Sequence, residues 1–323
     1  MRNTESLLKV REAHKAPEAE GICGFELLAV DSGALPQFEA GAHIDVHLPG
    51  DVVRQYSLCN PPGEAHRYQI GVLRDAAGRG GSIAMHDQVN EGSTLQISQP
   101  RNHFPLHENA TRSLLFAGGI GVTPILAMAE QLGSRGAQFE MHYCTRSLVR
   151  TAYVERLRHS KFADSVYFHH DDGPPAQRLN LVEQLRGPLS GTHLYVCGPK
   201  GFMNAVLATA RDTGWSESNV HFEYFSGSEV HSSHDRHFEV VLKRSGRVIR
   251  VEAAQAVTHA LAEQGIEIPV SCEQGVCGTC LTRVLEGEID HRDLYLMPEE
   301  QARNDLFLPC CSRAKSDRLV LDL

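Results

Sequence analysis

Hydrophobic and polar residues alternate in different ways along three stretches of the chain. Up to about residue 107, short runs of strand-like character are separated by turns rich in Gly, Pro and Asn: FELLAV, HIDVHLP, VVRQYSLCN, RYQIGVL and TLQIS. Such runs are typical of antiparallel strands in an all-β barrel. One helical stretch interrupts them at residues 82–89. We therefore expect residues 1–107 to form a Greek-key β-barrel.

Buried strands alternate with amphipathic helices between residues 108 and 226. The predicted strands are SLLFAGG, FEMHYCTR, SVYFHHDD, HLYVCGP and NVHFEYF, and the predicted helices are PILAMAEQLGSRG, AYVERLRHS and GFMNAVLATARDTG. Strands that alternate with helices favour a parallel sheet with crossover helices. This second stretch is therefore predicted to be an α/β domain.

The last stretch begins after a polar segment, SGSEVHSSHD, which has no apolar periodicity. Its composition predicts a linker, placed at residues 227–236. Residues 237–323 then show a hairpin that turns at Ser245 and Gly246, a short helix in QAVTHALAEQGI, a cysteine-rich loop and a final strand, RLVLDL. A turn of two residues between such runs favours an antiparallel hairpin. We predict a third, separate domain here.

Composition narrows the class of protein. The 323 residues suggest two or three domains, and the 40 acidic against 31 basic residues give a net charge of −9. This balance argues against a nucleic-acid partner and suits docking onto a basic protein surface, although it equally serves solubility alone. The sequence shows no secretory signal and no long apolar run that would cross a membrane. Nine cysteines without such a signal suggest reduced thiols or metal ligands, and a cytoplasmic protein.

Four cysteines carry the strongest chemical signal. Cys272, Cys277 and Cys280 have the spacing C-x4-C-x2-C, and 29 residues separate Cys280 from Cys310. This is the spacing of plant-type [2Fe–2S] sites. Each iron needs two thiolates, so the loop must curl to present its sulfurs inward, and glycines within it permit the necessary backbone conformations. Their amides can also approach the cluster sulfurs.

Two other interpretations of these cysteines fit the spacing less well. A structural zinc site usually has two closely spaced cysteine pairs, which this arrangement lacks. Four unrelated buried thiols are disfavoured by the tight spacing. Cys311, adjacent to Cys310, leaves the fourth ligand open on spacing alone. Cys23, Cys59 and Cys144 are interpreted as ordinary buried residues.

Two glycine turns in the α/β stretch are candidate anion sites. The first joins a strand to a helix through the segment Gly118 to Pro124, GGIGVTP, and the second is Cys197-Gly198-Pro199. Both should lie at the carboxyl ends of neighbouring strands, where α/β sheets bind ligands, and a helix N-terminus favours a phosphate. Either turn alone is often purely structural. Arg146 can pair with a nucleotide or remain a solvated loop residue.

The barrel stretch holds a second possible phosphate site. Arg54-Gln-Tyr56-Ser57 lies at the end of a predicted strand, where the Tyr ring can pack on a flavin and the Arg can bind a phosphate. Further along, the segment 79–82, RGGS, opens the predicted helix and offers another phosphate cradle. Either motif alone is explained as well by a hairpin and a glycine turn.

These motifs, R-x-Y-S, GGIGVTP, CGP and CEQGVCGTC, occur in the order found in one family. The chain resembles the phthalate dioxygenase reductase family from about residue 20 to its end. The resemblance implies an FMN-binding barrel, an NADH-binding α/β domain and a C-terminal β-grasp ferredoxin domain. It also implies FMN rather than FAD, and an NADH-dependent oxidoreductase.

The resemblance assigns individual residues as well. Contacts with FMN fall on Arg54, Tyr56, Ser57, Val72, Arg74, Gly80, Gly81, Ser82, Thr123 and Phe225. The NADH side falls on Gly119, Arg146, Cys197, Gly198 and Pro199. The cluster ligands match Cys272, Cys277, Cys280 and Cys310, because the family's SRAKS segment here follows at residues 312–316. Cys197, near the nicotinamide, and Thr123 and Phe225, near the flavin ring, are the residues assigned to the catalytic centre.

The implied reaction is electron transfer from NADH to a partner oxygenase. Hydride transfer from nicotinamide C4 to flavin N5 would precede single-electron steps to the cluster and then to a Rieske-type terminal oxygenase. The sequence does not specify the aromatic substrate of that partner. An alternative is a flavin and iron–sulfur redox sensor or binding module without an oxygenase. Metal binding by His231, His234 and His237, or by residues 169–172, was considered and disfavoured.

Overall fold

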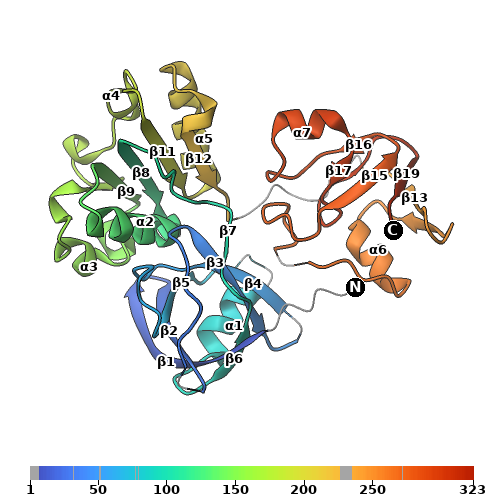
Figure 1. Cartoon of the computed structure of the whole chain (residues 1–323), viewed down its shortest axis with the longest axis horizontal. Coiled ribbons are helices and arrows are strands. Elements are labelled where there is room, and N and C mark those ends of the chain that lie inside the picture. Colours follow the sequence, from blue (N-terminus) through green and yellow to red (C-terminus); the bar gives the residue numbers. More distant parts are fainter. Residues whose placement is uncertain are drawn as a thin grey trace. The chain divides into compact units, whose positions relative to one another are not determined.

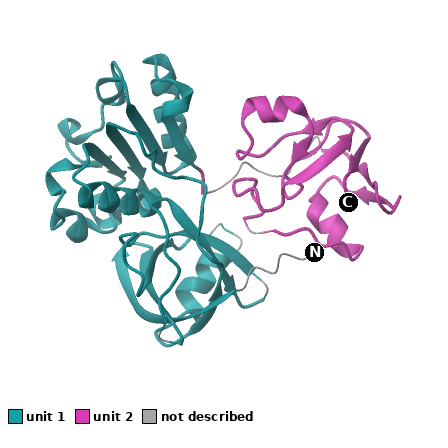
Figure 2. Ribbon diagram, viewed as in Figure 1, with its two compact units in different colours: residues 1–223 teal, residues 224–323 magenta. Residues whose placement is uncertain are grey.

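A computed structural model shows the arrangement of the chain (Figure 1) and describes residues 7–31, 33–50, 52–76, 78, 80–225, 235–270 and 272–323. The chain divides into two compact units, residues 1–223 and residues 224–323 (Figure 2). No helix within the described residues is long and apolar enough to span a membrane.

The first part of unit 1 is an antiparallel, barrel-like sheet, as the sequence predicts. Its strands are β1 (Leu8–Ala19), β2 (Ile22–Ala29), β3 (Ala42–Leu48), β4 (Val52–Ser57), β5 (Tyr68–Leu73), β6 (Thr94–Ile97) and β7 (Arg101–Asn102). They lie in the order β4-β3-β6-β1-β2-β5, with β7 beside β3. Because successive side chains of a strand point to opposite faces, every second residue of β5 enters the barrel interior, and Tyr68, Ile70 and Val72 are all buried. Helix α1 (Gly81–Gln88) lies within one residue of its predicted limits.

Strand β1 is the longest strand of the barrel, and the hydrophobic pattern did not indicate it. Its pairing with β2 shifts register between Glu12 and His14 and again near Pro17. The carboxylate of Glu12 is buried and accepts the backbone N–H groups of His14 (3.1 Å) and Glu26 (3.3 Å). A buried acidic side chain thus satisfies backbone donors at the bulge, in a strand with few apolar residues.

The second part of unit 1 is the predicted parallel sheet. It consists of β8 (Arg112–Gly118), β9 (Phe139–Thr145), β10 (Val166–His170), β11 (Thr192–Cys197) and β12 (Val220–Glu223), in the order β10-β9-β8-β11-β12. Its helices are α2 (Val122–Ser134), α3 (Val154–Arg158), α4 (Leu181–Leu185) and α5 (Lys200–Asp212). Strands are added on one side of β8 and then on the other, so the sheet has a switch point at β8 and β11. Ligands bind at such points in open α/β sheets.

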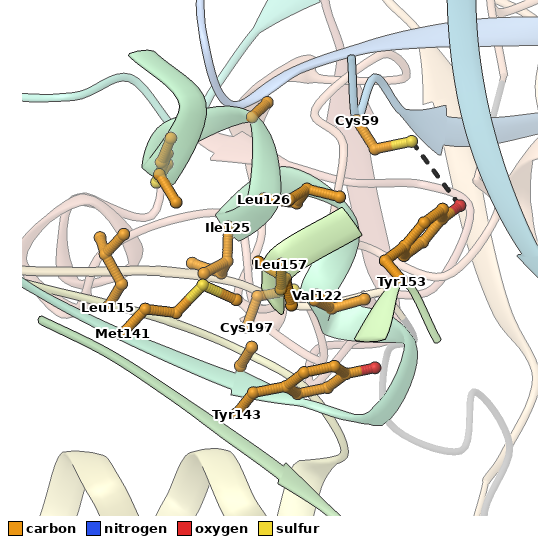
Figure 3. Close-up of a cluster of buried hydrophobic side chains, with 14 of the residues drawn as sticks. Cys59, Leu115, Val122, Ile125, Leu126, Met141, Tyr143, Tyr153, Leu157 and Cys197 are labelled. Carbon is orange, nitrogen blue, oxygen red and sulfur yellow. Dashed lines mark hydrogen bonds between the residues drawn. The ribbon is translucent and has the colours of Figure 1, made fainter. Parts of the chain in front are cut away.

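The barrel and the parallel sheet share one hydrophobic core. Cys59 and Tyr153 pack beside Ile125, Leu126 and Leu157 (Figure 3). The Cys59 thiol donates to the Tyr153 hydroxyl at 3.7 Å. Polar contacts also join the two parts, such as Arg156 Nη1 to Gln69 Oε1 at 3.2 Å. This common core explains why residues 1–223 form a single compact unit. The predicted division after residue 107 falls between β7 and β8 and remains a prediction.

Unit 2 contains the predicted ferredoxin-like sheet. Its strands are β13 (Phe238–Leu242), β14 (Val248–Val251), β15 (Thr282–Glu286), β17 (Leu306–Phe307) and β19 (Arg318–Leu321), in the order β14-β13-β19-β15-β17. Strands β16 (Ile289–Asp290) and β18 (Arg313–Ala314) form a separate pair, and the helices are α6 (Val257–Glu263) and α7 (Pro298–Arg303). The predicted hairpin turns at Gly246, whose N–H donates to Leu242 at 2.8 Å. Each of the three main sheets thus takes its strands from one continuous stretch of the chain: β1–β7, β8–β12 and β13–β19.

Candidate functional site

The two glycine turns of the parallel sheet meet, as the sequence predicts. Strands β8 and β11 run side by side with Ala117 opposite Cys197. A Cβ atom on Gly198 would lie 2.8 Å from the Cα of Gly118, and one on Gly121 would collide with the backbone of Cys197. Only glycine allows this approach of two backbones. The turns thus form one continuous backbone surface at the switch point of the sheet.

The thiol of Cys197 lies at the base of this surface. The residue is fully buried at the end of β11, and its register partner on β12 is Glu223. Burial raises the pKa of the thiol well above its ordinary value, and the negative charge of Glu223 raises it further. Cys197 is therefore a neutral thiol at physiological pH.

Glu223 is a site residue that the sequence analysis missed. Residue Glu223 is only half-buried as a whole, but its carboxyl group is shielded, and its Oε2 atom has no hydrogen-bond partner within the described chain. Burial raises its pKa to about 8, while a hydrogen bond from the Ser57 hydroxyl lowers it. One carboxyl group thus links the end of β4 with the end of β12. Its position at the carboxyl end of a strand, beside Cys197, was the only signal in the sequence.

The R-x-Y-S motif forms the other side of the site. The Tyr56 ring packs against the barrel core, and burial raises the pKa of its hydroxyl. Arg54 Nη1 donates to the carbonyl of Val53 at 2.7 Å. Its side chain covers the start of α1, because a Cβ on Gly81 would lie 2.7 Å from Arg54 Nε. A guanidinium group and the N-terminus of an eight-residue helix therefore lie together, which suits a phosphate.

The turn before α1 is fixed by its own hydrogen bonds. Gly80 has a left-handed conformation with φ of 79°. The Ser82 hydroxyl accepts the N–H of Asp75 at 3.0 Å. Arg74, by contrast, donates to Asp87 at 2.9 Å in a largely exposed ion pair. The structure thus shows Arg74 paired with a carboxylate of α1. A phosphate contact from Arg74, implied by the family resemblance, remains a prediction.

The remaining predicted residues lie at different places around this site. Val72 is buried in β5, and its carbonyl accepts a hydrogen bond from His86 at 2.8 Å. Thr123 is buried at the start of α2, and its methyl group would lie 2.9 Å from a Cβ on Gly71 of β5. This contact joins the barrel to the parallel sheet.

Gly119 and Arg146 flank the glycine turns. Gly119 has a positive φ of 51°, and space remains open around its Cα. Arg146 is exposed directly after β9, the strand next to β8. Pro199 precedes α5 as its N-cap. Phe225 belongs to unit 2, where it is 37 % exposed, so its predicted contact with a flavin ring remains a prediction.

The four predicted cluster ligands are all buried and form two thiol pairs. Cys272 shares a hydrogen bond with Cys277, and Cys280 shares one with Cys310. Within each pair this hydrogen bond lowers the pKa of one thiol, Cys277 or Cys310, and raises the pKa of its partner. Two pairs of thiolates are what two bridged irons need, two ligands for each.

Backbone amides point at these sulfurs. The N–H of Gln274 donates to Cys272 Sγ at 3.4 Å, and the N–H of Gly275 donates to the sulfur of Cys310. Gly275 has a φ of +74°, and a Cβ there would collide with Cys311. Amides that face sulfur stabilise negative charge on it. The loop therefore fits a sulfur-rich, negatively charged group.

The choice between Cys310 and Cys311 is supported by their partners. Cys310 faces Cys280 and the amide of Gly275. Cys311 also shares a hydrogen bond with Cys310, but its other contacts are the carbonyl of Leu308, to which it donates at 3.6 Å, and the hydroxyl of Ser312, rather than Cys280. This arrangement favours Cys310 as the fourth ligand.

The alternative metal sites gain no support. Over the described ranges, no three His, Cys, Asp or Glu side chains gather as a single ion requires. His169 has partners on both ring nitrogens, His142 at 3.0 Å and the carbonyl of Gln177 at 2.8 Å. His231 and His234 lie outside the described residues.

Comparison with known proteins gives the family. The chain is 55 % identical to a vanillate O-demethylase oxidoreductase from a Pseudomonas species, over 94 % of this chain and 96 % of the relative. It is 39 % identical to the phthalate dioxygenase reductase of Burkholderia cepacia, over 99 % of this chain and 98 % of the relative. The chain belongs to the phthalate dioxygenase reductase family. Residues 240–315 of the present chain match the family model of the 2Fe-2S iron-sulfur cluster binding domain. Residues 97–220 match the N-terminal domain of the DmmA-like dimethylamine monooxygenase subunit.

A solved structure extends the family relationship to the fold. Phthalate dioxygenase reductase superposes on this family member with a TM-score of 0.79 at 38 % identity, and the match covers 98 % of each chain. That relative is described as a modular structure for electron transfer from pyridine nucleotides to [2Fe–2S]. The family and the three-part fold predicted from the sequence are confirmed.

Proposed function

We propose that this protein is the reductase component of a two-component aromatic oxygenase system, which passes electrons from NADH through FMN and a [2Fe–2S] cluster to a Rieske-type terminal oxygenase. The two thiol pairs, Cys272 with Cys277 and Cys280 with Cys310, carry this proposal. They occur in one chain with a flavin-type barrel and a nucleotide-type sheet. Family membership supports the same function, since its relatives are named as oxidoreductases and reductases of such oxygenases.

The residues on the barrel side would hold FMN. Arg54 and the N-terminus of α1, from Gly80 to Ser82, would bind its phosphate. Tyr56 and Ser57 would contact its ring and side chain, with Thr123 and Phe225 near the ring. When bound, FMN supplies the chemistry that connects a two-electron donor to a one-electron acceptor. The protein's part is to place the ring and to exclude water from it.

The residues on the sheet side would hold NADH. The continuous backbone surface of Gly119, Gly198 and Pro199 would accept the dinucleotide, and Arg146 would pair with its phosphate or ribose. Cys197 is buried and neutral, so it would act through shape and contact near the nicotinamide rather than as a base. Glu223 keeps its proton near neutral pH, so it adds little charge there.

The partner is proposed from the relatives' names. Vanillate O-demethylase and phthalate dioxygenase both act on small aromatic acids, as their names state. We therefore infer a terminal oxygenase whose substrate is a small aromatic acid. A redox sensor without an oxygenase partner is the alternative, and it is distinguished by sustained electron throughput to an external acceptor.

A spectrum and a turnover assay on the purified holoprotein test this function. Flavin and iron–sulfur absorbance are expected together, and phosphate analysis of the released flavin should identify FMN. NADH should then support continuous reduction of cytochrome c. A colourless holoprotein without labile sulfide would overturn the proposal, and a coloured protein without throughput would favour the sensor.

A further inference from the structure

A buried carboxylate stands at the beginning of the iron–sulfur domain. Asp235 lies three residues before strand β13, and its side chain is 3 % exposed. Arg292 binds both of its oxygens, through Nη1 at 2.8 Å and Nη2 at 2.6 Å. Arg313 Nε lies 3.7 Å from the same carboxylate. One anion is thus shared by two arginines.

Among the described residues, a second carboxylate, Asp290, lies on the outer side of this group. Arg292 also donates to Asp290, which is partly exposed. Arg313 is 3 % exposed and donates to the carbonyls of Gln255 (2.7 Å) and Glu252 (3.0 Å). Carbonyls solvate a guanidinium group but do not neutralise it. Without Asp235, the buried Arg313 would lose the carboxylate that lies 3.7 Å from its Nε, which is costly for a buried cation.

This ion-pair network reaches the cluster site along two paths. Arg313 follows Cys310 by three residues, and β18 pairs it directly with Asp290. Along the second path, the N–H of Arg292 donates to Ser312 at 3.1 Å, and Ser312 donates to Asp293 at 3.2 Å. The adjoining Leu294 N–H then donates to Gly275 at 2.9 Å, in the loop that carries three of the proposed ligands.

We propose that Asp235 is a positioning residue for the iron–sulfur site: its carboxylate holds the segments after Cys310 and beside Gly275 in place and sets the local charge that the cluster experiences. The inference rests on the proposed function, because it requires a cluster at Cys272, Cys277, Cys280 and Cys310. It concerns a residue just outside the ferredoxin sheet, where the sequence analysis expected only linker.

The electrostatic consequence has a definite sign. Reduction adds an electron to a cluster that is already negatively charged. Removing the negative charge of Asp235 leaves a more positive local charge beside the buried Arg313, in a poorly screened place, and this favours the reduced state. The midpoint potential of the cluster should therefore rise when Asp235 is neutralised.

A redox titration of the holoprotein tests this inference, with the cluster followed by electron paramagnetic resonance. Asp235→Asn is expected to shift the midpoint potential upward and to alter the cluster spectrum. Asp317→Asn is the matched control, since it removes the same charge from a side chain that is 97 % exposed. Solvent screens that charge, so a much smaller shift is expected. Equal shifts in the two variants would overturn the inference.

A second variant separates charge from packing. Arg292→Lys keeps the positive charge but loses the two-pronged contact with Asp235. We expect it to lower the thermal stability of the domain while leaving the midpoint potential near that of the wild type. If it shifts the potential as much as Asp235→Asn, the geometry of the ion pair rather than the charge of Asp235 sets the potential, and the electrostatic part of the inference is overturned.

Two outcomes distinguish this inference from the proposed function. A wild-type holoprotein without an iron–sulfur signal would reject the proposed function itself. A normal signal in the wild type, together with equal shifts of the midpoint potential in Asp235→Asn and Asp317→Asn, would reject only the inference. If Asp235→Asn does not fold, Asp290→Asn replaces it. That variant removes a partly exposed anion from the same arginine and should produce a smaller upward shift, and no shift would contradict the inference.

Discussion

The glycine turns of unit 1 and the cysteine loop of unit 2 both depend on glycine, but for different reasons. At the switch point of the parallel sheet, Gly118 and Gly121 have negative φ angles of −115° and −61°, which any residue adopts. They are needed because two backbones approach too closely for a side chain. In the cysteine loop, Gly275 and Gly278 have φ angles of +74° and +70° and are also closely packed.

This difference reflects how each site is built. Regular strands and helices bring the two turns of unit 1 together, so Gly118 and Gly121 supply only space, whereas Gly119 between them supplies a positive φ without close packing. No regular element shapes the cysteine loop, so glycine must supply both the curvature and the space. A site on a regular scaffold should therefore be sensitive to side-chain volume, whereas a site on a loop should be sensitive to volume and conformation together.

Loss of a cluster ligand should have the largest effect. Cys280→Ser replaces a thiolate in one of the two pairs, and we expect nearly complete loss of iron–sulfur absorbance and of cytochrome c reduction. Reduction of the flavin by NADH should persist, because unit 1 is unchanged. Cys23→Ser, at a half-buried cysteine of the barrel, is the control and should retain both activities. Loss of flavin reduction in Cys280→Ser would show that the two units are not independent.

Gly275→Ala should be the next most damaging change. Its positive φ costs roughly 1–2 kcal/mol for a residue with a Cβ, and the collision with Cys311 adds about 1–3 kcal/mol. Iron–sulfur absorbance should therefore disappear at a lower urea concentration than in the wild type.

Gly119→Ala provides the comparison for the loop. Gly119 also has a positive φ, but a Cβ there would meet open space, so only the conformational cost of roughly 1–2 kcal/mol applies. Fluorescence of Trp215, the single tryptophan, reports on unit 1. If Gly275→Ala and Gly119→Ala lower the unfolding free energy equally, the collision of a Cβ at position 275 with Cys311 does not contribute, and the packing part of the prediction is wrong.

Gly121→Ala tests the role of volume alone. Its backbone angles suit alanine, yet its Cβ would collide with the backbone of Cys197, so we expect a loss of about 1–3 kcal/mol in the unfolding free energy of unit 1. Gly201→Ala, in α5 with open space around it, should instead stabilise by up to about 1 kcal/mol. Urea unfolding followed by Trp215 fluorescence measures both. A neutral Gly121→Ala would contradict the close approach of the two turns.

The smallest effect should be a dependence on pH from Glu223. Its pKa is raised from 4.5 to about 8, so the folded protein holds this proton more tightly than the unfolded chain. Its contribution to stability is complete below pH 4.5 and is lost as pH rises toward 8, with a slope of at most roughly 1.4 kcal/mol per pH unit. Glu223→Gln should lack this slope. If the difference in unfolding free energy between the two proteins is the same at every pH, the shielded carboxyl group does not titrate as described.

Much of the fold could be predicted because local patterns agreed with the tertiary structure. The alternation in RYQIGVL matches the buried face of β5, and the apolar periodicity after Pro124 matches α2. The cysteine spacing could be interpreted with confidence because thiolate chemistry permits few arrangements. The meeting of the Gly121 and Gly198 turns followed from the rule that parallel strands align their carboxyl ends.

The features that were missed depend on contacts between distant segments. Strand β1 lacks a clear apolar alternation, and it exists because β2 and β6 pair with it on both sides. Glu223 gained its role only when the fold placed it against Ser57 and Cys197. Asp235 looked like part of a polar linker, since no local pattern indicates that Arg292 and Arg313 will enclose it.

The order of strands in unit 2 has a consequence for biosynthesis. Strand β19, residues 318–321, lies between β13 and β15, so it completes the middle of the sheet rather than an edge. All four proposed ligand cysteines precede it in the chain. The sheet of the iron–sulfur domain can therefore close only after all four of these cysteines have been synthesised.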